Sequence, residues 1–497
     1  MKIAIAHYHL DPGGVSSVAC AQASLLREGP DADDAILVAS SPPRDGSRVP
    51  FHRVPGLAYD SSGRGPAGAT SLDLANEIQA ALARAFPGGA DLLIFHNPLI
   101  AKNRSLIGAL RELSQRGLPL LLEIHDFAED FRPDVYASAQ EYPEDCLYAA
   151  LGTRDRVALA ASGLGSAATF LLPNPIAEPS AFEPRLGYAA EVARGRNTVL
   201  YPVRAIGRKN LGEALLLSLF LPEGAEIAVT LPPKSPFDLP TYNAWKNLAA
   251  RKSLRIRFEA GLGASLEELY SLSYAALSVS VKEGFGYAFV EPSVRGLPLV
   301  GRAIPHLAAD FRSSGLALSG LYDELRVPAS DLALGPLEMR LEARIAALRS
   351  AYAPALPAER LGPMLDRLRS PFLGTTLDFG RLDPSSQADY VELLAENQNA
   401  IRRFQALNPF VGKLLLAQSS PELLTAERDA AVGAFSPARH RALLREACRK
   451  ALEIHGCAEL EASPVGGGKN EVAHRSIDKA RLLERMLVPE GFFLGAG

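Results

Sequence analysis

Residues 281–291 read Val-Lys-Glu-Gly-Phe-Gly-Tyr-Ala-Phe-Val-Glu, and this stretch decides the fold class. The run that leads into it, 275–281, is apolar and rich in small and β-branched residues, which predicts a buried strand. We expect a helix over 287–295. Gly284 and Gly286 let backbone N–H groups approach a ligand in the turn between strand and helix, and a helix N-terminus favours an anion there. The stretch therefore predicts a strand–turn–helix unit of an α/β sheet.

Two carboxylates bracket this turn. Glu283 precedes the first glycine, and Glu291 lies about one turn into the expected helix, where it would face the same crevice. A plainer interpretation makes Glu283 a helix cap and Glu291 a solvated surface acid. The motif alone does not choose between the two interpretations.

A second strand-like run, 197–203, ends at Arg204, and Lys209 stands at the start of the next expected helix. Open α/β sheets bind ligands at the carboxyl ends of their strands. Arginine offers a planar fork to phosphate oxygens and lysine a mobile point charge, so the pair suits a diphosphate. Taken alone, both residues are more simply explained as ordinary surface bases.

Three pieces of the chain together resemble the donor-binding half of retaining glycosyltransferases of the GT-B fold. These are the family-4-like, or group 1, enzymes that include sucrose synthases and bacterial phosphatidylinositol mannosyltransferases. The pieces are 204–209 (Arg-Ala-Ile-Gly-Arg-Lys), 283–291 and 296–300 (Gly-Leu-Pro-Leu-Val), in the family's order and spacing. Pro292 departs from the pattern, and we expect it near the helix start, where proline is tolerated. The resemblance implies an α/β chain with two Rossmann-like domains that face a deep cleft.

The resemblance also implies roles for individual residues. As catalytic residues it implies Arg204 and Lys209, which would stabilise the leaving diphosphate, and Glu283 and His125, which would orient the donor sugar. Glu291 would accept hydrogen bonds from ribose hydroxyls, and the loop at Gly261 would pack against the base. The pair Gly13-Gly14 is by itself most often a plain turn, but in the family a glycine loop here faces the donor phosphates. The expected donor-binding residues are Gly13, Gly14, Gly261, Gly284, Phe285, Gly286 and Glu291.

The amino-terminal third alternates expected strands and helices, which indicates a parallel sheet. Its apolar runs at 2–7, 91–95 and 119–124 are each followed by histidines and other polar residues. We expect a polar wall suited to a hydroxylated acceptor, formed by His96, Asn97, Lys102 and Asp126. His125 is also explained as a hydrogen-bonded structural residue. No metal is expected, because the histidines follow different strands without paired helical spacing.

The composition fits a globular enzyme, with 47% of the 497 residues hydrophobic and 22% charged. A net charge of −4 without a basic cluster argues against nucleic acid as the main partner. The chain begins directly with a strand, and we find no secretory signal and no apolar span of about 18 residues. Its cysteines form no Cys-x-x-Cys pattern. These features predict a cytoplasmic protein without an integral membrane segment.

The expected domains are an acceptor domain at 1–175, a linker at 176–196 and a nucleotide-sugar donor domain at 197–383. Residues 384–497 are expected to be mostly helical, with part of them packing back on the first domain. This extension would cover the acceptor cleft, form a homo-oligomer interface or add stability. The sequence does not decide among these roles.

Together these features predict a retaining, metal-independent hexosyltransferase that uses a UDP- or GDP-sugar, a small soluble hydroxylated acceptor and no cofactor. Two alternatives stay open. A GT-B glycoside phosphorylase would use the same cations for inorganic phosphate. Its substrates carry no nucleotide ribose, so Glu291 would have no ribose to bind. A non-catalytic sugar-nucleotide-binding scaffold is also compatible with the carboxyl-terminal addition.

Overall fold

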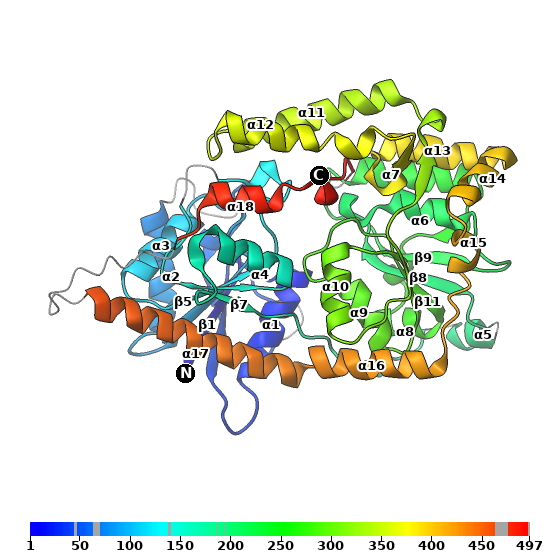
Figure 1. Ribbon diagram of the computed structural model, residues 1–497. Coiled ribbons are helices and arrows are strands. Elements are labelled where there is room, and N and C mark those ends of the chain that lie inside the picture. Colours follow the sequence, from blue (N-terminus) through cyan, green and yellow to red (C-terminus); the bar gives the residue numbers. More distant parts are fainter. Residues whose placement is uncertain are drawn as a thin grey trace. The chain divides into compact units, whose positions relative to one another are not determined.

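The computed structural model describes residues 1–495 except 44–46, 63–69, 138–140, 186, 194 and 463–475, and for 62, 190, 193 and 457–462 the backbone alone. The chain divides into two compact units. Unit 1 comprises Met1–Pro175, Leu348–Gly362 and Pro437–Leu487. Unit 2 comprises Ile176–Ala347, Pro363–Ser436 and Val488–Gly497. Figure 1 shows the elements of each unit.

Unit 1 contains a seven-stranded sheet in the order β3-β2-β1-β4-β5-β6-β7, in which all paired neighbours are parallel. The strands are β1 (Lys2–Ala6), β2 (Asp34–Ala39), β3 (Phe51–Arg53), β4 (Leu92–His96), β5 (Leu120–Ile124), β6 (Leu147–Ala150) and β7 (Thr169–Leu171). The strand order reverses between β1 and β4. In a doubly wound sheet this switch point opens a crevice at the carboxyl ends of the strands.

The inner strands β1, β2, β4, β5 and β6 are buried on both faces, as their nearly continuous apolar sequences require, whereas the edge strands β3 and β7 are partly exposed. The helices of the unit are α1 (Gly14–Leu26), α2 (Ser71–Ala85), α3 (Leu106–Gln115), α4 (Thr153–Leu159), α17 (Pro437–Ala462) and α18 (Lys479–Met486). Helices α2 and α3 pack on each other, while α17 packs on α1, β5 and β6. Described residues of 437–456 and 476–487 thus add to the core of unit 1 from far along the sequence.

Unit 2 repeats the same winding in a six-stranded sheet of order β10-β9-β8-β11-β12-β13, again with parallel neighbours. Its strands are β8 (Thr198–Arg204), β9 (Glu226–Leu231), β10 (Ile256–Arg257), β11 (Ser273–Ser278), β12 (Leu299–Arg302) and β13 (Gly320–Tyr322). A short antiparallel pair joins β14 (Arg326–Pro328) to β15 (Thr376–Asp378). The switch point of this sheet lies between β8 and β11.

The helices of unit 2 are α5 (Tyr188–Ala193), α6 (Leu211–Ser218), α7 (Leu239–Arg251), α8 (Leu266–Ser271), α9 (Tyr287–Val294), α10 (Pro305–Ser313), α13 (Pro384–Glu396), α14 (Gln398–Leu407), α15 (Val411–Leu414) and α16 (Pro421–Phe435). Helices α11 (Leu334–Tyr352) and α12 (Ala358–Arg367) each have residues in both units. No helix among the described residues has the length and apolar character needed to cross a membrane.

The α/β class expected from the sequence is confirmed by these two parallel sheets. The helix expected over 287–295 is α9, but Pro292 stands inside it, two residues before its end, rather than near its start. The helix tolerates this proline because it is short and ends at Val294. The carbonyl of Pro292 accepts hydrogen bonds from the N–H groups of Arg295 and Leu297, which closes the turn after the helix.

Candidate functional site

Two loops meet at the switch point of the unit 2 sheet, one after β8 and one after β11. The N–H of Val281 donates to the carbonyl of Arg208 at 3.0 Å. The Asn210 side chain donates to the carbonyl of Val279 at 3.2 Å and to Glu213 at 2.8 Å. Asn210 has φ of +52°, a left-handed conformation that asparagine tolerates better than most residues, and it precedes α6. These bonds fix the two loops against each other.

Charged side chains of the two loops form an ion cluster. Lys209 pairs with one carboxylate oxygen of Glu283, and Arg208 pairs with the other at 3.1 Å. The Glu283 side chain is only 7% exposed. Burial raises its pKa, but the charges of Lys209 and Arg208 outweigh burial and hold the pKa of Glu283 below its usual value. The buried Tyr201 hydroxyl donates to the carbonyl of Lys209, so the backbone under this lysine is anchored to β8.

Arg204 lies at the end of β8, and its guanidinium donates to the carbonyl of Pro232 at 2.9 Å. Its side chain has no ion pair with Glu283. Partial burial lowers the pKa of Arg204. Lys209 and Glu283 are therefore in contact, whereas Arg204, the last residue of β8, binds the backbone carbonyl of Pro232 instead.

The loop 284–286 leads into α9. Gly286 has φ of +87°, and a Cβ atom here would come within 3.1 Å of Leu307 and 3.2 Å of Phe289, so this position requires glycine. The Phe285 ring packs edge-on against Tyr287, Phe311 and Phe435. The side chain of Phe285 is thus part of the core, which leaves its backbone as the part able to face a ligand.

Glu291 lies on α9 and accepts a hydrogen bond from the Tyr270 hydroxyl at 3.2 Å. Arg295 stacks over the Tyr270 ring at 4.4 Å. Burial raises the pKa of Glu291, although Arg295 opposes this effect. Gly261 follows β10 and packs on β9, where an added Cβ would lie 3.1 Å from the carbonyl of Thr230. Glu291 and Gly261 thus contact neighbours other than Lys209 and Glu283.

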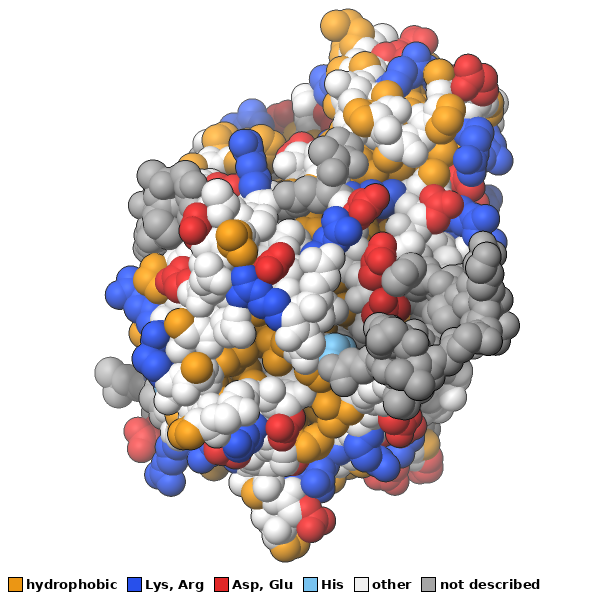
Figure 2. All heavy atoms as spheres, turned by 90° about the vertical axis from the view of Figure 1, so that its left-hand side faces the viewer, with side chains coloured by type: hydrophobic (Ala, Val, Ile, Leu, Met, Phe, Trp, Pro, Cys, Tyr) orange, Lys and Arg blue, Asp and Glu red, His pale blue; other side chains and the backbone are white. Residues whose placement is uncertain are grey.

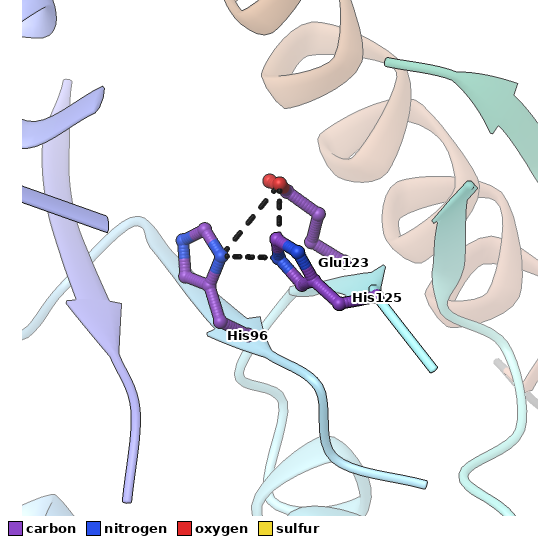
Figure 3. Close-up of side chains that lie close together, drawn as sticks. All are labelled: His96, Glu123 and His125. Atoms are coloured by element: carbon purple, nitrogen blue, oxygen red, sulfur yellow. Dashed lines mark hydrogen bonds and ion pairs between the residues drawn. The ribbon is translucent and has the colours of Figure 1, made fainter. Parts of the chain in front are cut away.

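At the carboxyl edge of the unit 1 sheet, His96, Glu123 and His125 converge (Figure 3). His96 Nδ1 and His125 Nε2 are 3.0 Å apart, and Glu123 Oε1 lies 3.6 Å from the first nitrogen and 3.3 Å from the second. Gln22 of α1 donates to the other oxygen of Glu123 at 2.7 Å. His7, after β1, contacts the carbonyl of His96 through Nδ1 at 3.0 Å. Three strand ends thus meet in one buried hydrogen-bonded cluster.

Burial decides the protonation of this cluster. It lowers the pKa of His96 to about 4, although the Glu123 charge opposes the shift, so His96 is neutral at pH 7. Burial also raises the pKa of Glu123, but His96 and His125 more than compensate and bring it to about 2. The mutual distances also suit a tetrahedral metal ion, whose ligand atoms lie about 3.3 Å apart when each bond is about 2.0–2.1 Å. The absence of a metal stays a prediction.

The remaining expected acceptor residues lie beside this cluster. Asn97 has φ of +58°, and its side chain donates to Asp126 at 3.3 Å and accepts from the N–H of Asp126 at 3.0 Å. Arg132 pairs with Asp126 at 3.2 Å. The Lys102 ammonium lies 4.7 Å above the Tyr59 ring. His96, Asn97, Lys102 and Asp126 are therefore brought together at one edge of the sheet.

Gly13 and Gly14 lie at the start of α1, after β1. Gly13 has an extended backbone with φ of −176°, which any residue adopts. A Cβ atom at Gly14 would meet nothing within 4 Å. The two glycines are thus exposed and are not required by local packing, a placement that leaves their expected role as a prediction.

A cavity of about 720 Å³ in unit 2 lies away from these residues. It runs along the edge strand β13 and is lined by residues 298–300, 319–326 and 407–419, with interruptions. Phe410 stacks on Tyr322 at its wall, with ring centroids 5.2 Å apart. We do not assign the donor to this cavity, because the charged side chains of Lys209, Arg208 and Glu283 lie at the switch point.

Sequence reasoning missed several residues of these sites. Arg208 lies within the 204–209 motif but has no predicted role there, and Glu123 has none either. Tyr59 and Arg132 received no role either. The strand register places His96 directly beside Glu123, a pairing that the order of the sequence alone does not show.

The chain is similar in sequence to a glycosyltransferase. It is 25% identical over 379 residues to mannosylglucosyl-3-phosphoglycerate synthase of Petrotoga mobilis, and the match covers 69% of this chain and 72% of the relative. No family model matches the chain.

Solved structures share its fold. HepE of Anabaena, in complex with UDP and glucose, matches with a TM-score of 0.54 at 13% identity over 90% of this chain and 98% of HepE. Sucrose-phosphate synthase of Thermosynechococcus elongatus matches with a TM-score of 0.51 at 14% identity over 91% of this chain and 100% of that enzyme. The fold is that of GT-B glycosyltransferases, and the sequence relative supports the glycosyltransferase class.

Proposed function

We propose that the protein is a retaining glycosyltransferase that moves a hexose from a UDP- or GDP-sugar to a hydroxyl of a small acceptor. The observation that carries the proposal is the ion cluster of Lys209, Arg208 and Glu283 at the switch point of unit 2. Doubly wound sheets bind nucleotides at this point, and cations held on two anchored loops suit a diphosphate. The similarity to a glycosyltransferase supports the same interpretation.

The donor diphosphate would bind Lys209, Arg204 and the backbone of 284–286. When the glycosidic bond breaks, negative charge grows on the leaving phosphate oxygen, and the preorganised cations stabilise it. The acceptor oxygen forms a bond to the anomeric carbon on the same face, and the departing diphosphate takes the acceptor proton. No protein nucleophile and no metal enter this scheme.

Two roles are compatible with Glu283: it positions Lys209, and it contacts the donor sugar. Its carboxylate is ionised and holds the ammonium in place through the ion pair. Because a diphosphate would compete for the same ammonium, Glu283 is released toward the donor sugar when the donor binds. Glu291 would accept hydrogen bonds from the ribose hydroxyls.

In unit 1, the acceptor would lie against Asn97, Asp126 and Lys102, and His125 would contact the transferred sugar. His125 Nε2 faces the buried side, toward His96 and Glu123. The other ring nitrogen, Nδ1, is therefore the one we assign to the sugar. This assignment predicts that the Glu123 cluster fixes the orientation of the His125 ring.

Calorimetric titration with UDP and GDP, followed by assays of diphosphate release from intact nucleotide sugars, tests the proposal. We expect micromolar-to-millimolar nucleotide binding, release of diphosphate on addition of acceptor, and an α-linked product from an α-linked donor by proton NMR. A β-linked product would overturn the retaining mechanism. Nucleotide binding without release would favour the scaffold alternative, and phosphate-dependent glycoside cleavage would favour the phosphorylase.

A further inference from the structure

Lys102 has an unusual environment for a lysine. It lies in the loop between β4 and α3, partly buried, with its ammonium 4.7 Å above the Tyr59 ring. Its ammonium makes no hydrogen bond or ion pair with any residue that the structure describes. Burial lowers the pKa of Lys102, the nearby Arg132 lowers it further, and Asp126 opposes both effects. A partly desolvated ammonium without a counterion is costly, so the site favours an anion.

The neighbouring carboxylate does not balance this charge. Asp126 is 3.2 Å from the Arg132 guanidinium and also accepts from the Asn97 side chain at 3.3 Å. Lys102 and Arg132 thus place two cations near one carboxylate, and of these two Arg132 is the one that pairs with it. Lys102 stands in the segment after β4, which ends at His96, and Arg132 stands in the segment after β5, which also holds His125.

The Tyr59 ring is the apolar surface against which the Lys102 ammonium lies. Its ring lies 4.9 Å from the His9 ring and 5.0 Å from the Tyr8 ring, and Lys102 lies over it. Burial raises the pKa of Tyr59 to about 12 even though Arg132 opposes the shift, so the phenol stays uncharged at neutral pH. The positive charge of Lys102 is therefore not met by a phenolate.

The attraction for an anion is local. On the face shown in Figure 2, Lys and Arg side chains are interspersed with Asp and Glu side chains rather than gathered in one basic area. A general electrostatic attraction for acids is not expected from a chain with a net charge of −4. The unpaired ammonium of Lys102 would select the ligand at this point.

We infer that the acceptor carries an acid group, a phosphate or a carboxylate, which binds between Lys102 and Arg132 at the carboxyl edge of the unit 1 sheet. This inference rests on the proposed function and names the class of its acceptor. The acid group would anchor the acceptor while a hydroxyl elsewhere on it faces His125. Asp126 would then orient Arg132 rather than neutralise the site.

The test uses the full-length protein saturated with UDP, which occupies the cations of unit 2. Inorganic phosphate, glycerate and glycerol are titrated at constant ionic strength. We expect phosphate or glycerate to bind and glycerol not to bind, and the preferred acid identifies the group. Lys102→Met should weaken the anion's affinity by at least roughly tenfold, the scale of a charge-assisted hydrogen bond, and Lys102→Arg should restore most of it.

Arg104→Met is the matched control. It removes a cation two residues away whose side chain is 91% exposed and which pairs with Asp60 at 3.9 Å. Its anion affinity should stay at the wild-type level. Equal anion affinity in Lys102→Met and wild type, or no binding of either anion by the wild type, would overturn the inference.

The two proposals fail in different ways. UDP affinity is measured first for each variant, and an unchanged value in Lys102→Met shows that unit 2 is intact. If the wild type does not bind UDP, the donor half of the proposed function fails. The difference between wild type and Lys102→Met toward phosphate then still reports on unit 1, since this substitution leaves Lys209 and Arg208 in place.

Discussion

The two sheets share the same winding, but their carboxyl edges hold different polar clusters. In unit 2, two loops bring Lys209, Arg208 and Glu283 into an ion cluster in which every group is charged. In unit 1, strand ends bring His96, Glu123 and His125 together in a more deeply buried cluster, where His96 is neutral at pH 7. One winding of the chain thus serves two kinds of polar site.

The difference follows from where the side chains originate. The unit 2 cations stand on loops beyond the strand ends, where they keep partial exposure and retain their charge. Glu123 and His96 stand on the strands β5 and β4 themselves, and burial there penalises charge. Under the proposed function, the unit 2 cluster would meet a charged ligand and the inner part of unit 1 would fix side-chain orientation.

The largest effect is expected from removing the unit 2 cations. Lys209→Ala and Arg204→Ala should each lower turnover by roughly 10²-fold or more, the scale measured when a group that stabilises transition-state charge is lost. Steady-state kinetics with a nucleotide sugar measures this effect. Lys252→Ala is the control, because Lys252 is also an ion-paired lysine of unit 2 but pairs with Glu392 and Glu396. Wild-type turnover in both variants would mean that neither Lys209 nor Arg204 stabilises charge in the reaction.

How much the sequence could predict differs between the two edges. The alternating strands and helices, and the glycine turn before α9, were sufficient for the fold class, because periodicity and turn chemistry are local properties. Which of the adjacent residues Arg208 and Lys209 meets Glu283 was not predictable, since a loop has no fixed period. Both residues do so in the structure.

Glu123 shows a second limit. A carboxylate in an apolar run looks like an exception to the strand pattern, and its partners His96 and Gln22 come from other elements. Only the strand register and the packing of α1 place them together. The assignment of 437–487 to unit 1 is likewise a matter of long-range packing, for which the helical pattern of α17 carries no local signal.

A smaller effect is expected at Glu291. If its carboxylate holds the ribose, Glu291→Ala should weaken the binding of nucleoside diphosphate by about 1.5–3 kcal/mol, as for hydrogen bonds to a charged group. Calorimetry measures this directly. Tyr270→Phe is the matched control, because it removes the hydroxyl that donates to Glu291 but leaves the carboxylate. Unchanged affinity in Glu291→Ala would limit the role of Glu291 to packing against α8.

The protonation of His96 should make unit 1 the acid-sensitive half. Burial, against the opposing charge of Glu123 and with His125 and His440 nearby, lowers the folded-state pKa of His96 from 6.5 to about 4. The unfolded chain therefore binds this proton first, and stability is lost as pH falls from about 6.5 toward 4. Between pH 7 and pH 5 the loss is about 2 kcal/mol. The pKa of Glu123, about 2, adds a loss only below about pH 4.5.

Hydrogen exchange compares the two sheets in one experiment. After correction for the intrinsic exchange rate, amides of β4 and β5 should lose more protection between pH 7 and pH 5 than amides of β8 and β11. His96→Gln should reduce this excess. An equal loss in both sheets would mean that the histidine cluster does not carry the acid sensitivity.

The smallest expected effect is that of a chelator. Turnover should stay within about twofold of the untreated value after treatment with EDTA, and purified protein should hold less than stoichiometric zinc by elemental analysis. Although the distances around His96, Glu123 and His125 suit an ion, two observations favour a hydrogen-bonded cluster over a metal site. Gln22 already occupies one oxygen of Glu123, and no described residue accepts from His96 Nε2, whereas a metal-bound histidine usually donates its other N–H to an acceptor. Stoichiometric zinc that is lost together with activity would make the unit 1 edge a metal site, and the contrast between the sheets would then lie between a metal centre and an ion-paired cluster.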